Sequence, residues 1–160
     1  MLDPAGRVLA GADAAESPPV PGSLETGILK TASGAYHVAK MPADAGGALL
    51  GYVVAGDLID DKFAHALRGG GNDDIVIADD TLLGTNLSRS AVPWQTRADW
   101  EKALDKDAAP RIVTIDNQNY EAVATLLGTE GGPRPLVIVA QSLDRAMEPY
   151  RQIQVGLLVL

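Results

Sequence analysis

Cysteine is absent from the 160-residue chain, which excludes disulfide scaffolds, thiol catalysis and zinc sites with cysteine ligands. A chain without cysteine fits a secreted or periplasmic location, although it does not require one. Aromatic residues make up only 4% of the sequence, so alanine, valine and leucine must build the core. With 46% hydrophobic and 21% charged residues, the composition is that of one globular domain or two small modules.

Positive charge is also in short supply, since the formal net charge is −8. A protein that binds nucleic acid needs a face rich in lysine and arginine to neutralise phosphates, so we expect no nucleic-acid partner. The sequence contains no complete transmembrane helix, which needs about 20 apolar residues. The first twenty residues carry Asp3, Asp13 and Glu16 and no apolar stretch, so we expect no signal peptide there.

Patterns that mark catalytic or metal centres are missing as well. His37 and His65 have no second ligand at a metal-binding spacing, and the acidic residues at 73–74 and 79–80 lack the alternation of a calcium loop. The glycines at 69–71 follow a predicted helix, whereas a phosphate loop precedes one. No nucleophile-elbow motif surrounds Ser88 or Ser90, and no histidine follows them. We therefore expect no catalytic residue, metal or cofactor, and the chain itself is not expected to be an enzyme.

Short apolar runs separated by turn residues predict strands in the first part of the chain. These strands are expected at 7–10, 27–31, 36–41 and 48–56, with turns at 3–6, 32–34 and 43–47. A helix is predicted to follow directly, with Asp57 as its N-cap and Gly69 just after its end. Residues 59, 63, 66 and 67 would form its apolar stripe. The first part is thus expected to be a small antiparallel meander that leads into a helix.

The second part of the chain repeats this alternation. A hairpin is predicted from 75–78 and 82–86, with Asp79 and Asp80 in its turn. Thr96 is expected to cap a helix through residue 106 with Trp100, Ala103 and Leu104 facing inward. Three strands follow at 111–115, 120–127 and 136–140, and Ser142 is expected to cap a last helix that begins at Leu143. Sequential hairpins with helices across them predict an antiparallel α+β fold, not a parallel doubly wound one.

A ligand pocket is the most plausible functional site that this order suggests. A concave sheet covered by a helix leaves room for a small molecule, which aromatic rings and a few polar donors orient. An arginine there can bind a carboxylate with two hydrogen bonds. The candidate ligand-binding residues lie on or beside the strands and the helix that would cover them: Thr85, Trp94, Arg97, Arg111, Thr114 and Tyr120. The alternative is that the tryptophans fill the core and the arginines lie at the surface.

Several segments together resemble one family. The segments are LDPAGRVLAG, MPADAGGALLGYVVAGDLIDDKFAHALR, DIVIADDTLLGTNL, YEAVATLL and PLVIVAQSLDRAMEPYRQIQ. They are similar to double Cache domains, the PAS-like extracytoplasmic sensors of bacterial transmembrane receptors, and are closest to the double sensory domain of two-component sensor kinases. The family's long N-terminal helix and first strand are missing here, as is its amino-acid-binding signature of Tyr, Arg and Trp. No ligand residue is therefore carried over by motif.

The resemblance implies a periplasmic or extracellular portion of an inner-membrane protein that binds an unknown small molecule. Residues 1–58 would form a first, partial Cache-like module and residues 59–142 a second one. Residues 143–160 would form a helix leading to a truncated transmembrane segment, and both ends look like boundaries of a fragment. The signal would pass through that helix to a histidine kinase, a diguanylate cyclase, an adenylate or guanylate cyclase, or a chemotaxis output. The apolar side chains of the tail at 153–160 are expected to pack against a second copy or to make lattice contacts, and the receptor is expected to be a homodimer.

Two other functions stay open on the sequence alone. The chain can be a ligand-free module that dimerises or binds another protein, which a cavity far smaller than the ~300–1,000 Å³ of ligand sites would favour. A small hydrolase is the third reading, because paired carboxylates are compatible with the sequence.

Overall fold

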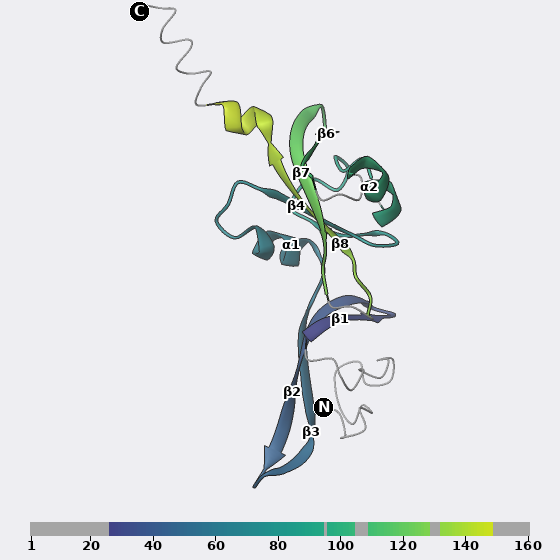
Figure 1. The fold of residues 1–160 in the computed structure, drawn as a ribbon, viewed down its shortest axis with the longest axis vertical. Coiled ribbons are helices and arrows are strands. Elements are labelled where there is room, and N and C mark those ends of the chain that lie inside the picture. The colour runs from purple at the N-terminus through teal and green to yellow at the C-terminus, as the bar shows by residue number, and fades with distance from the viewer. Residues whose placement is uncertain (1–25, 95, 105–108, 129–131, 149–160) are drawn as a thin grey trace, which may run out of the picture. The chain divides into compact units, whose positions relative to one another are not determined.

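A computed structural model describes residues 26–94, 96–104, 109–128 and 132–148 of the chain. The chain folds into two compact units. The first unit comprises Met1–Ile59 and Leu126–Pro135, and the second comprises Asp60–Thr125 and Leu136–Leu160. The elements are antiparallel strands with a few short helices, which confirms the predicted α+β class (Figure 1). The predicted strand at 7–10 lies outside the described residues.

The first unit contains a three-stranded antiparallel sheet in the order β1-β2-β3. Its strands are β1 (Thr26–Thr31), β2 (Gly34–Ala45) and β3 (Ala48–Leu58), so the predicted meander is confirmed. The strands β2 and β3 run longer than predicted, and only Gly46 and Gly47 remain in their turn, both at positive φ. Glycine adopts that left-handed backbone without a Cβ clash, which lets the turn be this tight.

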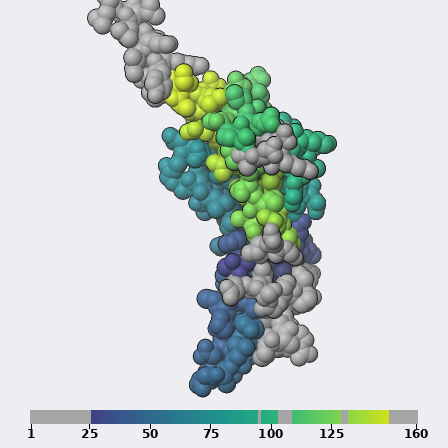
Figure 2. Space-filling model, in the orientation of Figure 1, coloured from purple at the N-terminus to yellow at the C-terminus, as the bar shows by residue number. Residues whose placement is uncertain are grey.

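β1 pairs only with the first half of β2, from Gly34 to Ala39. Beyond that point β2 and β3 continue as a two-stranded ribbon, drawn in blue in Figures 1 and 2. Lys40 is buried at the start of the ribbon, where its Nζ lies 4.1 Å from the centre of the Tyr52 ring. Large apolar side chains farther along the ribbon are exposed: Met41, Leu49, Leu50 and Val53. In the described part of the chain, no strand pairs with the outer edge of β3.

The second unit contains a five-stranded sheet in the order β5-β4-β8-β7-β6. Its strands are β4 (Asp74–Ala78), β5 (Leu82–Thr85), β6 (Arg111–Ile115), β7 (Gln118–Leu126) and β8 (Leu136–Ser142). The predicted β4–β5 hairpin is confirmed, and the predicted strands at 111–115 and 120–127 pair with each other as β6 and β7. The pairing of β4 with β8 links segments far apart in sequence, and all five residues of β4 are buried. β4 is therefore the most completely buried strand of this sheet.

Helix α1 (Asp61–Arg68) packs against β4 and β5. It begins later than predicted, because β3 continues to Leu58 and uses the backbone groups near Asp57 in its ladder with β2. Asp60 is the actual N-cap, and its Oδ1 accepts a hydrogen bond of 2.9 Å from the Phe63 N–H. The predicted apolar stripe is also wrong in part, because Ala66 and Leu67 are exposed and Ala64 is buried instead. The predicted end of the helix at Gly69 is confirmed.

Helix α2 (Arg97–Leu104) lies beside the five-stranded sheet and starts where predicted, after Thr96 (Figure 1). The Thr96 Oγ1 accepts from the Asp99 N–H at 3.3 Å and donates to the Asp99 carboxylate at 2.8 Å, so the predicted cap is confirmed. Trp100 is fully buried, as predicted. The predicted last residues of the helix, 105 and 106, and the side chains of Ala103 and Leu104 lie outside what the structure describes.

Residues 143–148 are helical and continue directly from β8. The Ser142 Oγ accepts a hydrogen bond of 3.2 Å from the Arg145 N–H, which confirms Ser142 as the N-cap. Among the described residues, no helix is long and apolar enough to span a membrane. The predicted transmembrane start at 153–160 falls beyond the described residues.

Candidate functional site

A cavity of about 350 Å³ opens in the second unit between α2 and the turn that joins β4 to β5. Its volume falls within the ~300–1,000 Å³ range of small-molecule sites. The lining residues come from two segments, the turn and the first turns of α2: Asp79, Asp80, Thr96, Arg97, Ala98 and Glu101. The cavity therefore lies where the end of β4 meets the N-terminus of α2.

Backbone hydrogen bonds fix the two walls of this cavity to each other. The Arg97 N–H, at the first residue of α2, donates to the Asp79 carbonyl at 2.6 Å. The Asp79 N–H donates to the Thr81 carbonyl at 2.9 Å and closes the β4–β5 turn. Because the orphan amide of the helix terminus is satisfied by the turn, the opening between the walls has a defined width.

The polar lining carries more negative than positive charge. The lining residues include three carboxylates, from Asp79, Asp80 and Glu101, and one guanidinium, that of Arg97. The Arg97 Nε donates to the Glu101 Oε1 at 2.7 Å in a helical i,i+4 pair, with about a third of each side chain exposed. Such a pair stabilises the helix by only about 0.3–0.5 kcal/mol, so a ligand can rearrange it at small cost. The cavity is therefore suited to an organic cation or to a zwitterion.

An aromatic pair supports α2. The Trp94 and Trp100 rings meet edge to face, with centroids 4.8 Å apart and planes at 66°. The Trp100 indole N–H donates to the Trp94 carbonyl at 3.1 Å. An edge-to-face pair of this kind contributes about 0.5–1.5 kcal/mol beyond the area it buries. Trp94 and Trp100 thus hold the segment that presents Thr96 and Arg97.

The six candidate residues predicted from the sequence do not come together around one cavity in the described structure. Arg97 lines the cavity, and Trp94 lies in the segment that leads into α2. Thr85 is buried in β5, where its hydroxyl donates to the Ile75 carbonyl at 2.9 Å and accepts from the Leu87 N–H at 3.1 Å. Its hydrogen bonds thus complete the local fold of β4 and β5.

The other three candidates belong to the β6–β7 hairpin. Arg111 and Thr114 are exposed on β6, and the Thr114 hydroxyl donates to the Asn119 Oδ1 at 3.2 Å. Tyr120 is buried opposite Val113, so it lies on the other face of the hairpin from Thr114. Their roles in ligand binding stay predictions.

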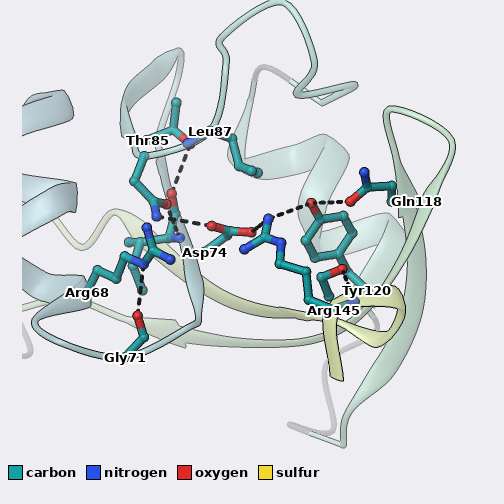
Figure 3. A network of polar contacts seen from close by, with 11 residues as sticks. Arg68, Gly71, Asp74, Thr85, Leu87, Gln118, Tyr120 and Arg145 are labelled. Atoms are coloured by element: carbon teal, nitrogen blue, oxygen red, sulfur yellow. Dashed lines mark hydrogen bonds and ion pairs between the residues drawn. The ribbon is translucent and has the colours of Figure 1, made fainter. Parts of the chain in front are cut away.

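Tyr120 takes part in a separate polar network, shown in Figure 3. Its hydroxyl lies 3.4 Å from both the Arg145 Nη2 and the Gln118 Oε1. Burial raises the pKa of the Tyr120 hydroxyl, and the nearby Asp74 carboxylate raises it further. The Asp74 carboxylate accepts a hydrogen bond of 2.7 Å from the same Arg145 Nη2. This network lies apart from the residues that line the cavity.

Another ion pair joins α1 to the segment that follows β5. The Asp61 carboxylate accepts hydrogen bonds from Arg89 Nη2 at 2.8 Å and Nε at 3.0 Å, and its Oδ1 also accepts from the Thr85 N–H at 2.9 Å. The hydrogen bond from Arg89 lowers the pKa of Asp61, and the Thr85 amide adds to this effect against a partial desolvation. Both charged side chains are almost half exposed. We infer that this ion pair stabilises the second unit and has no role in ligand binding.

Sequence reasoning missed most of the cavity lining. Asp79 and Asp80 were interpreted as turn residues and Thr96 as a helix cap, and these local roles are confirmed. The missing information was that the turn and the cap meet through the Arg97 amide, a contact across a segment without regular structure. The sequence carries no local signal for this contact, because aspartate is favoured in any hairpin turn and threonine at any helix cap.

No family model and no curated protein matches the chain. Its structural neighbours are ligand-binding domains of chemoreceptors. One is the ligand-binding domain of the Pseudomonas fluorescens chemoreceptor CtaA in complex with L-leucine, at 15% identity and a TM-score of 0.41. The alignment covers 77% of this chain and 53% of that one, and the complex with L-isoleucine gives a TM-score of 0.42 at 14% identity, with 78% and 52% covered.

Another neighbour is the ligand-binding domain of the Pseudomonas aeruginosa PAO1 amino acid chemoreceptor PctB in complex with L-Arg. It is 12% identical, with a TM-score of 0.41, and the alignment covers 82% of this chain and 56% of that one. The chain thus spans about half the length of these structures. TM-scores below 0.5 give no basis for transferring a ligand, so the chemistry of the cavity depends on the residues of this chain.

Proposed function

We propose that the chain is part of the extracytoplasmic sensor domain of a bacterial transmembrane receptor and binds a small molecule beside α2. The observation that carries this proposal is the 350 Å³ cavity, whose two walls are joined by the Arg97–Asp79 backbone hydrogen bond. A site of that volume admits a molecule of metabolite size. Because the lining includes three carboxylates and one guanidinium, the favoured ligand is an amine or another small cation.

Each polar group has a separate task in this proposal. Asp79 and Asp80 accept hydrogen bonds from the ammonium group of the ligand, and charge-assisted bonds of this type are about twice as strong as neutral ones. Arg97 binds a carboxylate where the ligand carries one, after leaving Glu101. The proposal thus includes the ligand-binding role that the sequence predicts for Arg97. The proposed domain order is also that of the resemblance, with modules at 1–58 and 59–142 and a helix at 143–160 that leads toward the membrane.

The signal in this proposal passes from the second unit to the C-terminal helix. β8 pairs with the fully buried β4 and runs without a break into the helical residues 143–148. A displacement of the sheet therefore moves the start of the helix as well. Beyond residue 160, we propose an inner membrane and a cytoplasmic output domain of the kinase, cyclase or chemotaxis type, in a homodimeric receptor.

The test is a thermal-shift comparison of the diamine putrescine with the dicarboxylate succinate, two molecules of the same carbon number and opposite charge. We expect putrescine to raise the melting temperature and succinate to leave it unchanged. Saturation at about 100 times the Kd stabilises a protein by about 2.7 kcal/mol. Asp80→Asn should weaken the shift, whereas Asp73→Asn, outside the cavity, should not.

Two results would argue against the proposal. Equal shifts with both compounds would show that the lining charge does not select the ligand. No shift in a wider screen of amines, carboxylates and nucleobases would favour the ligand-free interaction module instead. The exposed apolar side chains of the β2–β3 ribbon are the observation that supports this second function.

A further inference from the structure

A single buried carboxylate links the core of the second unit to the C-terminal helix. Asp74, the first residue of β4, is only 2% exposed. Its Oδ2 accepts a hydrogen bond of 2.7 Å from Arg145 Nη2, and its Oδ1 accepts one of 3.1 Å from Asn86 Nδ2. A buried carboxylate that lost such partners would be strongly destabilising. The Asp74 side chain therefore holds Arg145 in place.

Arg145 lies in the first turn of the helical residues 143–148, and its guanidinium reaches back over the sheet. Figure 3 shows it between the Asp74 carboxylate and the Tyr120 hydroxyl. The hydrogen bond to Asp74 raises the pKa of Arg145, so the side chain stays cationic at every physiological pH. One guanidinium thus joins three elements: β4, β7 and the start of the C-terminal helix.

The same strand that carries Asp74 ends at the cavity. β4 runs from Asp74 to Ala78, and the next two residues, Asp79 and Asp80, line the cavity. Four residue steps of ~3.3 Å place the two ends of the strand ~13 Å apart. β4 is buried throughout, pairs with β8 along its whole length and pairs with β5 from Val76 to Ala78. We therefore expect a displacement at the turn to be carried along β4 to Asp74.

We propose that Arg145 is a latch that couples the cavity end of β4 to the C-terminal helix. In the closed arrangement, seen here, Arg145 is bound to Asp74 and lies beside the Tyr120 hydroxyl. In the open arrangement, a shift of β4 withdraws Asp74, the guanidinium is hydrated and the first turn of the helix is released. Coupling of this kind needs an element with two discrete arrangements, and in this proposal that element is the ion pair between the half-exposed Arg145 and the buried Asp74. The direction of signalling rests on the proposed function, whereas the latch does not.

Hydrogen exchange of the backbone amides at 145–148 tests the latch without any ligand. Arg145→Gln should speed their exchange at least about tenfold, because local opening no longer has to break the ion pair. Arg145→Lys keeps the charge but lacks the planar fork and should give an intermediate rate. Glu148→Gln, an exposed change on the same helix, is the control and should alter the rates less than about twofold. Unchanged exchange in Arg145→Gln would overturn the latch.

A double-mutant cycle tests the coupling along β4. Ala78→Gly loosens the buried cavity end of this strand, because glycine removes a packed methyl group and adds backbone freedom. In the wild-type background this change should speed exchange at 145–148, and in the Arg145→Gln background it should add no further increase. Equal, additive increases in both backgrounds would overturn the coupling. If Arg145→Gln does not fold, Arg145→Lys takes its place in the cycle. Neither arm uses a ligand, so failure here is distinguishable from failure of the putrescine test.

Discussion

Replacement of Trp100 by alanine should destabilise the second unit by about 3–5 kcal/mol, which is typical for the loss of a buried tryptophan. The side chain is 0% exposed, packs edge to face on Trp94 and donates its indole N–H to the Trp94 carbonyl. The lost aromatic contact supplies about 0.5–1.5 kcal/mol of this total, and the cavity left by the indole supplies most of the rest. Because α2 carries Arg97 and Glu101, the loss of Trp100 should also weaken ligand binding.

The assay is urea unfolding followed by tryptophan fluorescence. The chain has two tryptophans, and both belong to the second unit, so the signal reports on that unit alone. In Trp100→Ala the remaining fluorophore, Trp94, gives the transition. Trp94→Ala is the matched control and should cost less, because Trp94 is only partly buried. A loss below about 1 kcal/mol in Trp100→Ala would refute the reasoning that this side chain anchors α2.

Two further predictions concern the attachment of α1 to β5. Gly84→Ala should lower the unfolding free energy by about 1–3 kcal/mol, because a Cβ there would overlap the Asp60 carbonyl group. Gly70→Ala is the control, since its Cβ would meet no atom within 4 Å. Equal melting temperatures of the two variants in a thermal melt would contradict the overlap. The pKa of Asp61 is lowered by Arg89, so the stability from this pair is present above about pH 4 and is lost as pH falls through the folded-state pKa. Asp61→Asn should therefore be less stable than wild type at about pH 6, by at most about 1 kcal/mol because the pair is so exposed. In urea titrations this difference should shrink as the pH is lowered to about 2.5, and a constant difference would count against the pair.

The strands that pair locally could be predicted from the sequence, and the reason is turn chemistry. The β6–β7 hairpin turns at Asp116 and Asn117, both with positive φ of 49° and 59°, and aspartate and asparagine tolerate that backbone best after glycine. The start of α1 could not be predicted in this way. Asp57 and Asp60 are both good N-caps, and the choice depends on β3 continuing its ladder to Leu58, a tertiary effect.

In the candidate site, too, local features could be predicted from the sequence and contacts between distant segments could not. Arg97 is predictable from its place between the β4–β5 hairpin and the short helix and from its ability to bind a carboxylate, and it lines the cavity. Asp79 and Asp80 carry no local sign of a second role, since any hairpin turn favours aspartate. Asp74 and Arg145 lie far apart in the chain, and only the pairing of β4 with β8 brings them within hydrogen-bond distance. Interactions that depend on non-local strand pairing are therefore the part that sequence patterns do not contain.

The exposed ribbon of the first unit has a practical consequence for anyone who purifies this chain. The outer strand β3 spans 11 residues with a single charge, Asp57, and no lysine or proline to discourage pairing with a neighbouring molecule. Among the described residues no strand pairs with this edge, and an open strand edge can template aggregation when protein is concentrated. A charge in place of Leu50, which is 55% exposed, removes little packing and should raise the concentration at which samples stay monodisperse.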